Sequence, residues 1–501
     1  MLEAGLDQIA SWLWGPGLIA LIVGGGLILF LYQGAWPWRL LGPSLRAWRN
    51  QRRRCESSGS AVGMTHPTPP PGELSPLQAL ASALSGTIGM GNLAGVAVAI
   101  QTGGPGALWW MWVTAIIGMN TKFFTATLAL THRGRDTLGR VRGGPMYVIT
   151  AALGPRWRPL SLLFCIAGII GCLPILAVHQ LVQLTQDALQ WLPPAAQIPG
   201  ARGRMGTFVV AFLVALLVAG VQAGGLRRVG RVAGALVPWM VALYALLVAW
   251  VLLRHAADIP RCLALIWHDA WTGEAVAGGS FAAVLSHGIR RGALSNEAGV
   301  GTEMMAHAVA QSPHPVHQGL VAMAGPVVDT LWVCTGTALT ILLSGLWRDP
   351  ALHGVTLTTM AFDEAMPGVG RWLLFACAAA FALSTLFTYH FYGSTCFSYL
   401  FGAERESWYG RFYLLCIVGI ALLSLEAAVH VIDIAYALMA CTTMSITLRL
   451  APVVMQQVRD YRAHHNGNAC APARTAQTCH TSAVQDQSVE SHPCPPKKRA
   501  P

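Results

Sequence analysis

Several stretches of the sequence are long and apolar enough to cross a lipid bilayer. The hydrocarbon core of a bilayer requires about 20 apolar residues in each spanning helix. Runs close to that length occur at 14–34, 206–223, 231–253, 371–392 and 409–427. Only 11% of the residues are charged, whereas an ordinary soluble domain carries about 25%. The pattern therefore predicts an all-α polytopic membrane protein and argues against a soluble globular domain.

Extending the analysis to weaker apolar segments predicts about 11 transmembrane helices. Ser75-Pro76 is typical of a helix start, because a capping residue precedes proline in the first turn. The expected helices cover 14–34, 76–100, 105–131, 160–185, 206–224, 230–253, 276–311, 317–344, 371–400, 409–427 and 430–453. No basic residue precedes the first run, as a secretory signal would require, so we expect that run to remain a membrane helix.

Basic residues are distributed unevenly between alternate loops. Most of the Lys and Arg residues fall in the linker after the first helix, in the loops around 133–158, 227–231 and 405–411, and in the tail. Because such residues favour cytoplasmic loops, the distribution predicts an outside N-terminus and a cytoplasmic C-terminus in a plasma or inner membrane. It also argues against nucleic-acid binding, because the bases do not form one face.

The predicted helix at 76–100 is interrupted by a run of small residues, Ser85-Gly86-Thr87-Ile88-Gly89-Met90-Gly91-Asn92. Each Gly costs about 1 kcal/mol relative to Ala inside a helix, so we expect the helix to unwind here. Unwound backbone at membrane depth is tolerated around a protected cavity. Its carbonyls can bind a cation and its amides can bind a carboxylate. Close helix packing through small residues is the alternative.

A second interruption, in the predicted helix at 276–311, contains charged residues. It reads Arg290-Arg291-Gly292-Ala293-Leu294-Ser295-Asn296-Glu297-Ala298-Gly299. A charged Glu at the centre of a bilayer costs about 2.5–3.5 kcal/mol, and Arg290 or Arg291 is a candidate partner for Glu297. A loop at the membrane surface is the alternative. Two other charged residues, Lys122 and Asp329, lie inside predicted helices, where we expect buried structural pairs.

The two interrupted helices lie five helices apart. Broken helices at corresponding places in two halves indicate a transporter built from inverted repeats. We therefore divide the chain into an extra N-terminal transmembrane helix (1–35), a basic and Pro-rich cytoplasmic linker (36–74), two five-helix repeats (75–255 and 256–455) and a disordered cytoplasmic tail (456–501).

Five motifs give the chain a resemblance to the alanine or glycine:cation symporter family, which includes the sodium:alanine symporters. They are Gly86-Thr87-Ile88-Gly89-Met90-Gly91-Asn92, Gly103-Gly104-Pro105-Gly106-Ala107, Gly143-Gly144-Pro145-Met146-Tyr147, Ser295-Asn296-Glu297-Ala298-Gly299, and Tyr392-Gly393 followed by Tyr399-Leu400-Phe401-Gly402. The resemblance implies the leucine-transporter fold, a five-plus-five inverted repeat with one extra helix. It also implies import of a small neutral amino acid with sodium and no organic cofactor.

The resemblance further implies a set of binding residues. The substrate carboxylate would bind the amides of Met90 and Gly91, and the other substrate contacts would be Thr87, Asn92, Ser295, Asn296, Thr385 and Tyr389. Sodium would bind the carbonyls of Ser85 and Ile88 and the hydroxyls of Ser384 and Thr385. The chain departs from the family pattern at Thr388-Tyr389-His390, at Glu303 and at His179-Gln180.

Three other functions are compatible with a polytopic chain. Proton coupling is suggested by His390 and Glu303, because His titrates near physiological pH. A channel usually needs a pore-lining ring, whereas two offset breaks favour a closed site. A membrane-embedded enzyme needs acids, His or metal ligands clustered at one depth, and the sequence indicates no such cluster.

Overall fold

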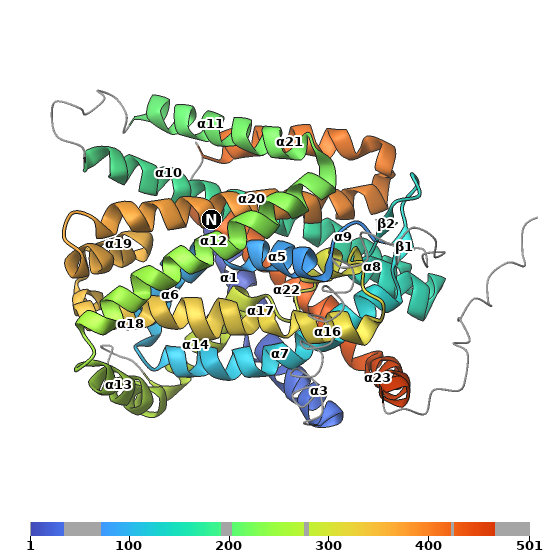
Figure 1. The fold of residues 1–501 in the computed structure, drawn as a ribbon, viewed down its shortest axis with the longest axis horizontal. Coiled ribbons are helices and arrows are strands. Elements are labelled where there is room, and N and C mark those ends of the chain that lie inside the picture. The colour runs from blue at the N-terminus through green and yellow to red at the C-terminus, as the bar shows by residue number, and fades with distance from the viewer. Residues whose placement is uncertain (1, 35–71, 192–202, 275–279, 422–424, 466–501) are drawn as a thin grey trace, which may run out of the picture.

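The computed structural model describes residues 2–34, 72–191, 203–274, 280–421 and 425–465. The described chain is helical apart from a short hairpin of β1 (Gly134–Arg135) and β2 (Val141–Arg142). Most of the long helices run in roughly the same direction through the molecule, horizontally in Figure 1. Helices α13 (Ile259–Thr272) and α19 (Gly354–Ala365) lie at one end, and the hairpin and α23 (Ala451–His465) lie at the other.

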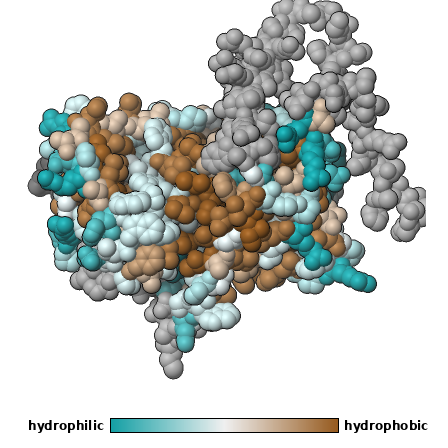
Figure 2. Space-filling model, turned by 90° about the horizontal axis from the view of Figure 1, so that it is seen from below, coloured by the Kyte–Doolittle hydropathy of each residue, from teal (hydrophilic) through white to brown (hydrophobic). Residues whose placement is uncertain are grey.

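Apolar side chains form a band between two polar ends. In Figure 2 the hydrophobic residues gather in the middle of the visible face, and hydrophilic residues gather at both ends. Exposed apolar side chains on α11 (Arg204–Gln222) and α12 (Gly225–Arg254), such as Leu213, Leu216 and Leu246, contribute to the molecule's apolar surface. A surface of this kind suits contact with lipid acyl chains.

Eight helices in the described residues are long and apolar enough to cross a membrane, or nine if a bent pair counts as one span. They cover Pro16–Gln33, Ala107–Thr131, Pro155–Gln190, Arg204–Gln222, Gly225–Arg254, Pro315–Ser344, Gly370–Phe401 and Val429–Arg449, with the bent pair at 76–103. The two other expected spans correspond to the second broken helix and to α21 (Glu406–Ile420). The total of 11 therefore stays a prediction, as does the inverted repeat.

The first broken helix has the predicted start and the predicted interruption. Helix α5 (Pro76–Thr87) begins at Ser75, whose side chain accepts from the Gln78 amide while Gln78 caps the Ser75 amide. The helix ends where Ile88 and Gly89 turn into extended backbone, and a 3₁₀ turn (η3, Met90–Asn92) leads into α6 (Ala94–Gly103). The two halves are bent by 58°.

The second broken helix consists of α14 (Phe281–Asn296) and α15 (Glu303–Ala308). Between them the backbone is left-handed at Glu297, Gly299 and Gly301, with φ of 50°, 88° and 94°. Such φ values are easy for glycine but unfavourable for a residue with a Cβ. Glu297 is the only non-glycine residue with positive φ in the described chain, which is typical of a constrained functional segment.

Several helices occur where the sequence suggested loops or tail. Helices α13 and α19 lie in the connections around 256–275 and 346–370, and α1 (Leu2–Leu13) precedes the first span. Helix α23 extends to His465, ten residues into the segment expected to be disordered. These helices are too short to give an apolar run of membrane length, so a search for such runs misses them. The basic linker and the last 36 residues lie outside the described residues.

The remaining helices surround the two broken ones. Helix α5 packs against α12 and α20 (Gly370–Phe401), and α14 packs against α6 and α7 (Ala107–Thr131). The extra N-terminal segment, with α2 (Pro16–Ile19), a π-helical turn (η1, Ala20–Gly24) and α3 (Gly25–Gln33), packs against α7 and α22 (Leu425–Arg449). The π-helical η7 (Val327–Cys334) lies between α17 (Ala324–Pro326) and α18 (Thr335–Ser344) and contacts η3 and α14.

Candidate functional site

A cavity of about 480 Å³ lies between the two broken helices. Its walls come from η3 and α6 on one side, from α14 on another, and from α10 (Ile175–Gln190), α20 and α22. Ligand-binding cavities of several hundred Å³ lined by apolar groups and a few polar ones are typical of small-molecule sites. Of the predicted substrate contacts, the lining includes Thr87, Met90, Gly91, Asn92, Ser295, Thr385 and Tyr389.

Asp329 is not among the lining residues, but it joins the two breaks through hydrogen bonds. The Asn92 side-chain amide donates to its Oδ1 at 2.6 Å, and the Ser295 hydroxyl donates to its Oδ2 at 2.9 Å. The Thr330 hydroxyl also donates to Oδ2, at 2.8 Å, and Asp329 is fully buried. The carboxylate therefore fixes the first break relative to the second. The sequence predicted Asp329 only as a member of a buried structural pair. Its position as a charged residue in an apolar run was the only sequence signal for its role in joining the two breaks.

Glu297 is held by hydroxyl groups. Tyr389 donates to its Oε1 at 2.6 Å, and Thr302 donates to Oε2. The Tyr436 hydroxyl lies 2.6 Å from that of Tyr389 and 3.3 Å from the same Oε1. The expectation that Arg290 or Arg291 pairs with Glu297 is wrong. Arg290 instead forms an ion pair with Asp433 on α22 at 2.6 Å, and the Arg291 guanidinium donates to the Gly91 carbonyl.

Three of the four residues predicted to bind sodium, Ser85, Ser384 and Thr385, converge between α5 and α20. The hydroxyls of Thr385 and Ser384 point to the Ser85 carbonyl oxygen at 3.2 and 3.5 Å. The Ser85 hydroxyl in turn lies 2.7 Å from the Ser384 carbonyl and 2.6 Å from the Thr388 hydroxyl. Ile88 lies next to this cluster in sequence, at the point where α5 ends. Uncharged oxygens of this kind suit a hard cation.

Thr385 is shared by the oxygen cluster and the cavity. Its hydroxyl contacts the Ser85 carbonyl, and the residue also lines the cavity. A methyl group added at Gly89 would lie 2.7 Å from that hydroxyl. The lack of a side chain at Gly89 therefore lets the first break approach α20 closely.

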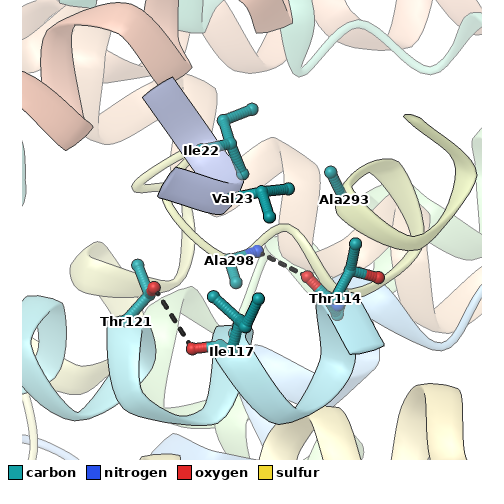
Figure 3. Close-up of a pocket in the computed structure, with 9 residues that line it drawn as sticks. Ile22, Val23, Thr114, Ile117, Thr121, Ala293 and Ala298 are labelled. Atoms are coloured by element: carbon teal, nitrogen blue, oxygen red, sulfur yellow. Dashed lines mark hydrogen bonds between the residues drawn. The ribbon is translucent and has the colours of Figure 1, made fainter. Parts of the chain in front are cut away.

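Asn296 lies away from the main cavity, although it was among the predicted substrate contacts. Its Oδ1 accepts from the Ala298 amide at 2.9 Å. It lines a separate void of about 10 Å³ between α7, the chain after α14 and the N-terminal segment. Figure 3 shows Ile22 and Val23 of that segment beside Ala298 and the Thr114 and Thr121 side chains of α7. A void of this size is at the lower limit for one water molecule.

Two features suggested for proton coupling lie outside the cavity lining. Glu303 forms a fully buried ion pair with Lys122 at 3.4 Å, and the Thr125 hydroxyl donates to it at 2.9 Å. Lys122 is therefore paired with Glu303, as expected for a structural pair. His390 lies among aromatic rings, 5.3 Å from that of Tyr413 and 5.8 Å from that of Tyr409.

Comparison with known proteins identifies the class of molecule. A model of the sodium:alanine symporter family matches residues 1–474. The sodium/alanine symporter AgcS of Methanococcus maripaludis is 31% identical over 459 residues, covering 91% of this chain and 96% of that protein. The amino-acid carrier protein AlsT of Bacillus subtilis is 32% identical over 391 residues, covering 77% of this chain and 80% of that protein.

A solved structure supports the fold. The structure of MhsT in complex with L-phenylalanine matches with a TM-score of 0.50 and 14% identity, over 77% of this chain and 99% of that one. At this identity the likeness establishes the leucine-transporter type of fold alone. Together with the family match, it confirms the predicted family and fold class, and it places the chain among transporters rather than enzymes. The chain belongs to the sodium:alanine symporter family and is a multi-pass membrane symporter of the amino-acid:cation class.

Proposed function

We propose that the protein imports a small neutral amino acid, alanine or glycine, together with sodium. The observation that carries the proposal is the position of Thr385, which lines the cavity and also belongs to the oxygen cluster with Ser85 and Ser384. A cation bound by these oxygens would fix the first break against α20. The same residues would then be in place for an amino acid in the cavity, so that occupancy of one site favours occupancy of the other.

The substrate would lie between Met90, Gly91 and Asn92 on one side and Ser295 and Tyr389 on the other. The proposal for the carboxylate is supported by the start of the helical segment at Met90, because the amides of a first helical turn lack intrahelical partners. Sodium would be bound by the carbonyls of Ser85 and Ile88 and the hydroxyls of Ser384 and Thr385. The hydrogen bonds that join these described residues involve only hydroxyl and carbonyl groups, without a carboxylate or an imidazole, which favours sodium over a proton.

Alternating access would convert binding into transport. With the N-terminus outside and the C-terminus cytoplasmic in a plasma or inner membrane, the bases around the β1–β2 hairpin mark the inner end of the molecule. One positive charge moving inward gains about 2.3 kcal/mol per 100 mV. At 1.4 kcal/mol per tenfold, this supports roughly 40-fold accumulation from voltage alone.

The proposal is tested by uptake of labelled alanine and glycine into proteoliposomes that contain the purified protein. We expect an imposed sodium gradient to drive uptake. Thr385→Val removes the shared hydroxyl at nearly constant volume and should raise the sodium concentration for half-maximal uptake by roughly 10-fold or more. Thr395→Val is the matched control, because its hydroxyl lies on the same helix and bonds only to the Phe391 carbonyl, at 2.8 Å.

Proton coupling is the second candidate, and the observation that favours it is the buried carboxylate of Glu303 at the start of α15, directly after the second break. Uptake driven by a proton gradient in the absence of sodium, and lost in Glu303→Gln, would replace sodium by a proton in the proposal. If uptake requires sodium but proceeds at the same rate in Thr385→Val as in Thr395→Val, the assignment of the cation to the α20 hydroxyls is contradicted.

A further inference from the structure

Four charged residues line the cavity, and only two of them form an ion pair with each other. Arg290 and Asp433 are joined at 2.6 Å. Arg291 and Glu297 also line the cavity, and neither forms an ion pair with any residue that the structure describes. Charged groups removed from bulk water are costly unless they are paired. The cavity therefore contains one positive and one negative group that, among the described residues, have no ion-pair partner of their own.

The positive group lies beside the start of the second half of the first broken helix. The Arg291 guanidinium donates to the Gly91 carbonyl, and its Nε has no hydrogen-bond partner. A methyl group added at Gly91 would lie 2.9 Å from its Nη2, and one added at Gly95 would overlap the guanidinium carbon. The absence of side chains at Gly91 and Gly95 thus creates the space that the guanidinium fills. The guanidinium bonds to a carbonyl, whereas the nearby carboxylates of Asp329 and Asp433 form no ion pair with it.

The negative group lies where the second broken helix ends. Glu297 follows α14 directly. The partial negative charge at the C-terminus of this helix therefore adds to the negative charge of the Glu297 carboxylate. The groups around it are the hydroxyls of Tyr389 and Thr302, which donate to it, and the hydroxyl of Tyr436 at 3.3 Å. Hydroxyl groups orient a carboxylate and solvate it, but they bring no positive charge. The electrostatic potential at this wall of the cavity therefore favours a cation.

We propose that Arg291 and Glu297 are the two poles of a site that selects zwitterions. The Arg291 guanidinium binds the α-carboxylate of the substrate, next to the amides of the first break. The Glu297 carboxylate faces the α-ammonium group. The inference rests on the proposed amino-acid transport and names the chemistry by which the cavity distinguishes an α-amino acid from an amine or a carboxylic acid of the same size.

A panel of three ligands tests the proposal on the unaltered protein. L-alanine carries both charges, L-alaninamide carries only the ammonium, and propionate carries only the carboxylate. Binding is measured by thermal stabilisation of the purified protein in detergent at saturating sodium. We expect alanine to bind at least roughly 10-fold more tightly than either analogue, because each analogue leaves one charged group without its hydrogen-bonded partner. Equal binding of alaninamide or propionate would overturn the proposal without any variant.

Variants then assign each pole to its residue. Arg291→Gln should weaken alanine binding roughly 10- to 100-fold and leave alaninamide binding unchanged. Glu297→Gln should weaken alanine binding and spare propionate. Gly95→Ala keeps the charge of Arg291 but displaces its guanidinium, so it should reproduce the ligand pattern of Arg291→Gln. Arg290→Gln is the control, because Arg290 already has a carboxylate partner, and it should change alanine and alaninamide binding by the same factor.

The outcomes separate this proposal from the proposed function. An Arg291→Gln protein that loses alanine and alaninamide binding equally would overturn the assignment of the carboxylate pole, even if sodium still drives alanine uptake. Selective binding of alanine without sodium-driven uptake would support the two poles and contradict the coupled transport. If neither alanine nor glycine stabilised the unaltered protein, both proposals would be overturned.

Discussion

Removing the Asp329 carboxylate should weaken substrate binding, because this side chain joins the two breaks. Its three donors are Asn92, Ser295 and Thr330, at 2.6 to 2.9 Å. In Asp329→Ala the Thr330 hydroxyl can rotate toward other acceptors, and the Ser295 hydroxyl already lies 3.2 Å from Cys334 Sγ. The Asn92 amide keeps only a long contact, 3.5 Å, to the main-chain carbonyl of residue 329. The lasting loss is therefore one hydrogen bond to a charged acceptor, about 1.5–3 kcal/mol.

This free energy should appear in the affinity for the substrate, because Asn92 and Ser295 both line the cavity. The KM for alanine in sodium-driven uptake should rise roughly 10- to 150-fold in Asp329→Ala. Asp329→Asn keeps an acceptor oxygen for Asn92 but loses the charge, so a smaller rise, roughly 2- to 10-fold, is expected. Asp363→Ala is the control, because that carboxylate contacts Gly368 and Arg371, and none of these three residues lines the cavity.

A double-mutant cycle distinguishes a bond between the breaks from general damage. Asn92→Ala and Asp329→Ala, alone and together, should show a coupling energy of about 1–3 kcal/mol in alanine binding, because residues that share a hydrogen bond are not independent. Additive effects, within about 0.5 kcal/mol, would refute the reasoning. An unchanged KM in Asp329→Ala would also refute it, provided that this variant elutes and melts like the unaltered protein.

Three further predictions concern the second break and the buried ion pair. Tyr389→Phe should raise the KM for alanine more than Tyr436→Phe, because the Tyr389 hydroxyl donates to the Glu297 carboxylate at 2.6 Å, whereas the Tyr436 hydroxyl lies 3.3 Å from it. Equal KM values would contradict this. Gly301→Ala should lower the melting temperature, because φ is 94° and a methyl group would lie 2.7 Å from Pro145 Cγ. Gly345→Ala is the control for backbone strain alone, because φ is 72° there but the added methyl group would meet open space. Lys122→Met should destabilise the protein by about 3–5 kcal/mol, because it leaves Glu303 unpaired. The double variant Lys122→Met with Glu303→Met should recover much of that stability in a thermal melt. A double variant no more stable than Lys122→Met would contradict a stabilising ion pair.

Local features of the site could be predicted from the sequence. The start of α5 at Ser75, the unwinding near Ile88 and the interruption after Asn296 all follow from residues within a few positions of each other. Capping groups and glycines act on the backbone next to them, so their effect does not depend on the rest of the fold. The convergence of Ser85 with Ser384 and Thr385 was implied by family resemblance, and residue types alone offered no route to it.

The partners of the charged residues could not be predicted in the same way. Glu303 pairs with Lys122, Arg290 pairs with Asp433, and Asp329 bonds to Asn92, all across long sequence separations. An apolar helix can bury any of its faces, so a single charge in it indicates that a partner exists without specifying which helix supplies it. The short helices α13 and α19 were missed for a related reason, since they form against other helices and lack a membrane-length run.

The wrong pairing of Glu297 with a neighbouring Arg shows why closeness in sequence misleads at a broken helix. Residues face each other on a helix at spacings of three or four, whereas Arg291 is six positions before Glu297 and on the other side of the point where α14 ends. The left-handed backbone at Glu297 turns its side chain toward Tyr389 and Tyr436, on α20 and α22. Arg291 meanwhile lies over Gly91 and Gly95 of the first break. The unwinding that was predicted from the glycines is thus what separates the two charges. A direct ion pair between them would remove the two poles that we propose for zwitterion selection.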